Sequence, residues 1–397
     1  MALKHSEADE HAQYEQVKMG NGSVVHMRKN DRVQLNEHIK EMYLTCNQSL
    51  SSCYGSAQTF LQFEVETGEI DKIKDMYLLL NVTNGSGSGT AFHPTFWWWD
   101  RLEVYCGGKF LFTRYPDPNM VECVLTKGDN WIVNNYSALA ITSANINTLY
   151  FLGSTVSASS TADYIVPIMD EFQQSNVPLS LCKRITYKVY LPPGTSIQTT
   201  TDTITLNSAS LYIKYAQADP VAGALLRKRH THSKVIPIVN YEYFQKTYAT
   251  TTSGTRITEQ LINSKGNVAG LLYLLRRTGT AYLQTLIAIA DHSVLNDTNS
   301  PIGVRNYKSA CVLKDESEQF GDTRLFRSLN FYFKSFCSYP DITLKHSSDT
   351  GGLDFSDNFK LEFNPATSTN PVELVVYTYK YGYLVIEPDG SLRVVME

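Results

Sequence analysis

Residues 97–114, WWWDRLEVYCGGKFLFTR, decide the fold because they read as a β-hairpin. Two apolar runs flank Gly107-Gly108, and paired glycines supply the positive φ angles that a tight two-residue turn requires. In the first run Leu102 and Val104 fall on one side of the strand, while charged residues alternate with them on the other. This period of two is typical of an antiparallel strand with one face on a core.

The same parity makes a prediction about two tryptophans at the start of this stretch. Trp97 and Trp99 would lie on the side opposite Leu102, so that something other than the local core must cover them. Exposed aromatic patches usually mark contacts. We therefore expect Trp97 and Trp99 to lie at a domain or subunit interface. The alternative is that a bulge or the preceding loop buries them within their own domain, and the spacing leaves both open.

Alternation of the same kind recurs along most of the chain. It predicts strands over residues 59–66, 74–83, 185–191, 203–216, 235–250, 268–277, 282–290, 308–314, 359–363 and 374–387. The inward parity changes near Asn207, which predicts a β-bulge. Helical periodicity is confined to short candidates at residues 118–126 and 324–335. The chain is therefore all-β, and many short strands with long loops favour sandwiches or jelly rolls over βαβ folds.

Composition limits the classes of protein to which this chain can belong. The chain has 397 residues, 43% of them hydrophobic, so there is ample apolar surface to bury and disorder of the whole chain is excluded. The net charge of −4 gives no global signature for nucleic acid. Seven cysteines without a CxxC pair indicate reduced, buried thiols. The N-terminus lacks the apolar core of a signal peptide, so synthesis in the cytoplasm is the simplest inference.

No pattern for catalysis stands out. The nucleophile elbow, the phosphate-binding loop, the zinc-protease helix and the dinucleotide fingerprint are all missing from the sequence. The sequence therefore predicts no enzyme, no catalytic residue and no cofactor.

Two weaker patterns could bind a metal. His230-x-His232 lacks a carboxylate four or five residues later and has basic neighbours, which favours a solvated linker over a metal site. Asp349, Asp354 and Asp357 could form an oxygen cage for structural calcium, although their spacing departs from the 12-residue calcium loop. The triplet that begins at Asp349 reads as a turn rather than an aspartic-protease motif.

One dense basic run lies between the two halves. Arg227, Lys228, Arg229 and Lys234 are its candidate contacts to phosphate, from lipid headgroups or nucleic acid. The competing interpretation is a solvated linker.

We divide the chain into an N-terminal arm (1–22), a first β-domain (23–218), a linker (219–234) and a second β-domain (235–397).

The order of the motifs resembles the double jelly-roll major capsid proteins of tailless icosahedral DNA viruses, the tectivirus-like and Polinton-like lineage. The segments that carry the resemblance are YG (54–55), FLQFEV (60–65), GEID (68–71), MYLLL (76–80), WDRLEVYCGG (99–108), VPLSL (177–181), LYIKY (211–215), TGGLDFS (350–356), the strand at 375–385 and DG (389–390). Asp354 stands where that family has Asn.

The resemblance implies two tandem eight-stranded jelly rolls with short helices in loops. It also implies a homotrimer whose six rolls mimic a hexagon and tile an icosahedral shell. Expected partners are neighbouring capsomers, minor capsid, penton and membrane proteins and an internal lipid membrane, without sequence-specific nucleic acid. The expected location is the virion capsid, with synthesis and assembly in the host cytoplasm. The competing function is a virion spike or a surface carbohydrate-binding jelly-roll module.

Overall fold

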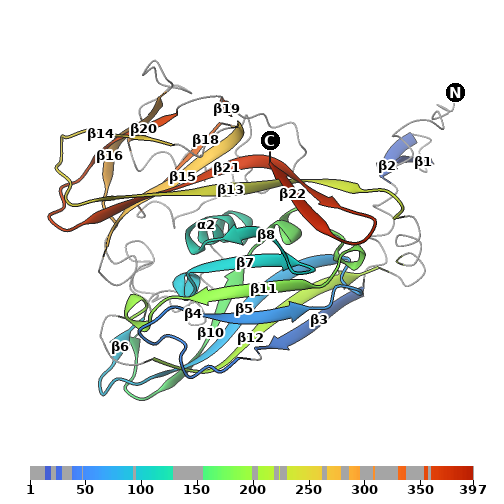
Figure 1. Cartoon of the computed structure of the whole chain (residues 1–397), viewed down its shortest axis with the longest axis horizontal. Coiled ribbons are helices and arrows are strands. Elements are labelled where there is room, and N and C mark those ends of the chain that lie inside the picture. The colour runs from blue at the N-terminus through green and yellow to red at the C-terminus, as the bar shows by residue number, and fades with distance from the viewer. Residues whose placement is uncertain are drawn as a thin grey trace.

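A computed structural model gives the structure of the protein. It describes residues 14–18, 24–28, 38–46, 48–92, 95–127, 155–198, 204–218, 223, 230–261, 266–278, 286–295, 307–308, 330–336, 353–355 and 359–396. Strands dominate this part of the chain, and they gather into two β-structures with a helix between them (Figure 1).

Eight strands form the first β-structure. They are β3 (His38–Thr45), β4 (Thr59–Val65), β5 (Lys72–Asn84), β7 (Arg101–Cys106), β8 (Lys109–Arg114), β10 (Thr161–Ile168), β11 (Ile185–Leu191) and β12 (Ile204–Gln217). They make two antiparallel four-stranded sheets, in the orders β10-β5-β12-β3 and β4-β11-β7-β8. Side chains on β11 alternate between buried and half-buried, as expected of strands with one face on a core.

Eight further strands form the second β-structure. They are β13 (Lys234–Tyr248), β14 (Ile257–Gln260), β15 (Gly266–Arg277), β16 (Ile289–Leu295), β17 (Tyr307–Lys308), β18 (Phe331–Ser335), β20 (Lys360–Pro365) and β21 (Val372–Ile386). Their sheet orders are β13-β21-β15-β18 and β14-β20-β16-β17. Two short strands extend the first of these sheets, with β19 (Leu353–Phe355) on β15 and β22 (Leu392–Met396) on β21.

The two β-structures have the same topology. When the eight strands of each are counted in chain order, one sheet has the order first-eighth-third-sixth and the other second-seventh-fourth-fifth. Two four-stranded antiparallel sheets connected in this way form a jelly roll. The predicted fold class, two tandem eight-stranded jelly rolls with short helices in the loops, is confirmed.

Short elements fill the connections. They are β1 (Tyr14–Lys18), β2 (Val24–Arg28), β6 (Thr90–Ala91), β9 (Thr155–Val156), α2 (Pro116–Lys127), α4 (Glu171–Gln174) and the 3₁₀ turns η2 (Thr95–Trp97), η4 (Leu179–Leu181) and η5 (Gly194–Ser196). Strands β1 and β2 pair only with each other among the described strands. The expected boundary between arm and first roll at residue 22 therefore falls inside this hairpin, between its two strands.

Several local predictions can be compared with these elements. The helix expected at residues 118–126 is confirmed as α2, and the bulge near Asn207 is confirmed as a register shift between Leu206 and Ser208. The second helix candidate, 324–335, is wrong over its last five residues, which form β18. Aromatic residues favour strands, and Phe331 and Tyr332 are buried where β18 pairs with β15. Residues 324–329 lie outside the described part of the chain.

The hydrophobic core of the first roll includes residues from the second half of the chain. Leu384, Ile386 and Leu392 are buried in the same cluster as the inward residues of the first roll. Next to them the Gly390 carbonyl accepts a hydrogen bond of 2.7 Å from the Lys183 backbone N–H. The end of β21 and the strand β22 thus fasten the two rolls together.

No helix in the described ranges is long and apolar enough to cross a membrane.

Candidate functional site

The interface between the two rolls is the most elaborate polar site in the described structure. Helix α2 leaves β8 and lies between the first roll and the outer face of the sheet that contains β13 and β21 (Figure 1). Alternation along β21 sends Leu374 and Val376 into the core of the second roll. Tyr377 and Tyr379 therefore face the other way, toward α2, where each is only 1% exposed.

A buried arginine is the centre of this interface. Arg114, the last residue of β8, forms ion pairs with Glu122 of α2 and, at 3.1 Å, with Glu171 of α4. Its Nε donates to the Met169 carbonyl at 3.2 Å. The side chains of Arg114, Glu122 and Glu171 are all fully or almost fully buried. A buried guanidinium is tolerable only when paired and hydrogen-bonded in this way.

The second roll contributes two tyrosines to the arginine cluster. The Tyr379 hydroxyl donates to Glu122 Oε1 at 3.3 Å. The Arg114 guanidinium lies over the Tyr241 ring at 4.8 Å from its centroid, within the range of a cation–π contact. Strands β13 and β21 therefore contact an ion cluster whose charged members all belong to the first roll.

The cluster holds more carboxyl groups than cations. Glu122, Glu171 and Asp170 surround Arg114, and burial raises the pKa of each. The pKa of Glu171 rises to about 8, because burial outweighs the attraction of Arg114. Glu171 Oε2 has no hydrogen-bond partner within the described structure. The Glu171 carboxyl therefore holds its proton more strongly than an exposed glutamate does.

A second cluster in the interface is centred on Asp117, at the start of α2. Asp117 accepts hydrogen bonds from Trp97 Nε1 at 2.9 Å and from the Tyr377 hydroxyl at 2.8 Å. Arg276 of β15 approaches the same carboxylate at 3.5 Å. One buried carboxylate thus joins a tryptophan of the first roll to a tyrosine and an arginine of the second.

The two tryptophans do not occupy the positions expected from the sequence. Trp97 and Trp99 are 1% and 0% exposed, so both side chains are covered by other residues of the chain, as in the alternative left open by the sequence. The physical reason is that β7 begins only at Arg101, whereas Trp97 belongs to the 3₁₀ turn η2. The alternation of side chains along β7 therefore does not extend to Trp97. Trp99 packs in the first core, and Trp97 lies one hydrogen bond from the inter-roll network.

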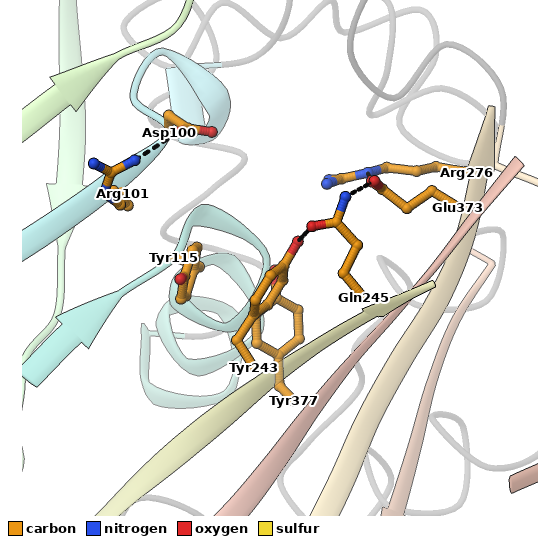
Figure 2. A pocket seen from close by; sticks show the side chains of 8 residues that line it. All are labelled: Asp100, Arg101, Tyr115, Tyr243, Gln245, Arg276, Glu373 and Tyr377. Atoms are coloured by element: carbon orange, nitrogen blue, oxygen red, sulfur yellow. Dashed lines mark hydrogen bonds and ion pairs between the residues drawn. The ribbon is translucent and has the colours of Figure 1, made fainter. Parts of the chain in front are cut away.

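A cavity of about 290 Å³ opens between the rolls (Figure 2). Its lining residues are Asp100, Arg101 and Tyr115 from the first roll and Tyr243, Gln245, Arg276, Glu373 and Tyr377 from the second. Tyr115 stacks on Tyr243 with ring centroids 4.7 Å apart, and Arg276 pairs with Glu373 at 2.8 Å. Two cations face two carboxyl groups, so the cavity is charge-balanced.

The basic residues singled out in the sequence are mostly beyond this site. Arg227, Lys228 and Arg229 lie outside the described residues. Lys234 is the first residue of β13, where it pairs with Ile386, and burial lowers its pKa. Lys234 is therefore part of a sheet rather than of a free loop.

The candidate metal ligands can be placed only in part. His230 Nε2 is 2.9 Å from the Glu387 carbonyl, and His232 is exposed. Asp349 and Asp357 lie outside the described residues, and Asp354 is in β19. Within the described ranges no three His, Cys, Asp or Glu side chains come together as a metal site.

Sequence reasoning missed Arg114, Glu122 and Glu171. The only local signal was an arginine that ends an apolar strand just before a helix. Its partners are 8 and 57 residues away along the chain, so no short motif could have linked them.

Comparison with known proteins was made at the level of sequence and of structure. No family model matches the sequence, and no curated protein matches it. Solved structures do match. A quasi-atomic model of the PBCV-1 virus capsid has a TM-score of 0.65 at 14% identity, over 90% of this chain and 96% of that one.

Two further capsid proteins are similar over most of their length. The Faustovirus major capsid protein has a TM-score of 0.58 at 12% identity, over 87% of this chain and 90% of that one. The mavirus major capsid protein has a TM-score of 0.54 at 11% identity, over 90% of each chain. The resemblance seen in the motifs is thus confirmed at the level of architecture: the chain has the double jelly-roll fold found in viral major capsid proteins.

Proposed function

We propose that this chain is a major capsid protein, three copies of which form a pseudo-hexagonal capsomer that tiles an icosahedral shell. The observation that carries the proposal is the likeness of the whole chain, both rolls included, to viral capsid proteins over about nine-tenths of their length. The role is structural, and its chemistry is that of assembly.

The inter-roll interface supports this function. A capsomer of six rolls needs a fixed angle between the two rolls of each chain, because an error at that joint would be repeated at every copy. The Arg114 and Asp117 clusters and the strand β22 connect the rolls at three separate places. Rotation of one roll against the other would break the hydrogen bonds at each of these connections.

Further assembly contacts are part of the proposal. The N-terminal arm (1–22), which includes β1, would reach neighbouring capsomers, and minor capsid, penton and membrane proteins would complete the shell. The basic run before β13 would face the interior, toward lipid or phosphate. The protein would be made and assembled in the host cytoplasm and would act in the virion capsid.

Mass in solution and electron microscopy test the proposal. The purified full chain should have a mass of about 134 kDa by light scattering, three times the 44.7 kDa chain. Negative-stain images should show particles with hexagonal outline. A stable monomer that binds glycans and forms no arrays would contradict the proposal and favour a spike or carbohydrate-binding module.

A further inference from the structure

A buried lysine points into the interior of the second roll. Lys380 of β21 is only 4% exposed, and lysine is rarely buried without a charged partner. It shares the inward side of β21 with Leu374 and Val376, which belong to the core of the second roll. Val268, which is opposite Lys380 on the neighbouring strand β15, belongs to the same core. The Lys380 side chain therefore lies inside the roll, beside its apolar core.

The strand on the other side of Lys380 supplies two polar side chains. Asn240 of β13 is directly opposite Lys380, and residues opposite each other in an antiparallel pair point to the same face, with Cβ atoms roughly 4.5–5.5 Å apart. Glu242 follows two residues later on that face, and its Oε2 is 2.7 Å from Lys380 Nζ. The ammonium group of Lys380 has therefore crossed from β21 to β13, where it meets a carboxylate next to an amide.

The carboxamide of Asn240 is held with its carbonyl polarised. Its Oδ1 accepts a hydrogen bond of 2.7 Å from the Tyr241 backbone N–H. This donor points at the oxygen on which negative charge develops when a nucleophile adds to Cγ, as in an oxyanion hole. An amine, a carboxylate that can accept its protons and a polarised amide are thus held together, which is the arrangement that amide exchange between side chains requires.

We propose that Lys380 and Asn240 form an isopeptide bond, which joins β13 and β21, the first and eighth strands of the second roll. Lys380 Nζ passes a proton to Glu242, and its lone pair then attacks Asn240 Cγ to form a C–N bond. Collapse of the tetrahedral intermediate breaks the bond from Cγ to Nδ2. In total two protons move from the lysine nitrogen through Glu242 to Nδ2, which leaves as ammonium. Glu242 ends as the carboxylate that it was at the start, and no oxidant or reductant is consumed.

The bond would secure a strand at the edge of its sheet. Among the described strands, β13 pairs with β21 alone. A covalent bond between residues 240 and 380 closes a loop that contains most of the second roll, and a crosslink across a long loop stabilises a protein by restricting its unfolded chain. The alternative is an ion pair between Lys380 and Glu242 without further chemistry. The inference concerns the roll itself and does not depend on the proposed capsid function.

Intact-mass spectrometry of the purified full-length protein tests the proposal. The wild-type mass should be lower than the mass calculated from the sequence by one ammonia. Tryptic digestion should then release a linked product that contains both Asn240 and Lys380, because trypsin does not cleave after an acylated lysine. The linked product is decisive, since an Asn-Gly pair such as residues 84–85 can also lose ammonia without forming a crosslink.

Three variants assign the roles of the three side chains. Lys380→Met and Asn240→Ala should each have the full calculated mass, because each removes one end of the bond. Glu242→Gln cannot accept a proton, so the linked product should form at least ~100-fold more slowly than in wild type. Lys246→Met is the matched control, because Lys246 lies on the same strand with its side chain exposed, and it should keep the mass deficit and the linked product.

The wild-type measurement decides the proposal even where a variant fails to fold. A wild-type protein with the full calculated mass would overturn it, and so would a mass deficit that persists in Lys380→Met. A linked product that forms at the wild-type rate in Glu242→Gln would overturn the role of Glu242 in proton transfer.

Discussion

Glu171 gives the sharpest quantitative prediction of this structure. Its carboxyl is buried between Arg114 and Asp170, and its pKa is raised to about 8 from an ordinary value of 4.5. The perturbation is Glu171→Gln, which has the same shape, keeps a polar group for Arg114 and cannot ionise. The variant therefore isolates the cost of one buried negative charge.

The sign of the effect follows from proton linkage. Between pH 4.5 and about 8 the folded chain keeps a proton on Glu171 that the unfolded chain has lost, so the free energy of unfolding falls as pH rises across this window. Because one pKa unit corresponds to ~1.4 kcal/mol, raising the pKa from 4.5 to about 8 sets an upper bound of about 5 kcal/mol on this loss of stability. Below pH 4.5 this loss of stability is absent, and above pH 8 it is complete.

Urea unfolding from pH 4 to 9 measures this effect. The difference between Glu171→Gln and wild type should increase steadily in favour of the variant up to about pH 8 and then level off. Glu64→Gln is the control, because its partner Arg184 and Glu64 itself are on the surface. Its stability should stay within about 0.5 kcal/mol of wild type across the range. A variant that gains nothing between pH 5 and 8 would refute the raised pKa of Glu171.

Three other substitutions test the joint between the rolls. Arg114→Met should cost about 3–5 kcal/mol in urea unfolding at pH 7, because it leaves Glu122 buried without its countercharge; a loss below 1 kcal/mol would contradict the ion cluster. Tyr377→Phe removes the hydroxyl that donates to Asp117 and should cost about 1–2 kcal/mol in the same assay, whereas Tyr243→Phe, whose hydroxyl bonds to an exposed Gln245, should cost less. Gly390→Ala should lower the melting temperature and quicken proteolysis of the C-terminal strand, because φ is +80° and a Cβ would meet the Leu181 carbonyl oxygen at 3.1 Å; an unchanged melting temperature would show that the turn relaxes at no cost.

The strands could be predicted from the sequence, whereas the interface between the two rolls could not. Leu102 and Val104 alternate with charged residues, and alternation is a local property that survives in the folded chain. Trp97 was misplaced because the strand parity was carried past the point where β7 begins. Nothing in the order of the residues marks that point, since η2 is held by its contacts with α2 and by the bond from Trp97 to Asp117.

Arg114 shows a second limit of the sequence. A cation that ends an apolar strand is compatible with either a solvent-exposed cap or a buried ion pair, and only the location of its partners decides between them. Glu122 is on the next helix and Glu171 is on α4, while Tyr379 comes from the other roll. Their meeting is a consequence of how the rolls pack, which local patterns do not encode.

The polar character of this joint has a physical rationale. Buried ion pairs contribute little net stability compared with apolar residues of the same volume, so stability alone does not explain Arg114 and Asp117 at the joint. Hydrogen bonds are directional, however, whereas apolar contacts allow two surfaces to slide. The bonds from Tyr377 to Asp117 and from Tyr379 to Glu122 each require one rotation of the second roll about α2. A chain whose proposed role is to repeat one angle between rolls throughout a shell gains from interactions that a small rotation would break.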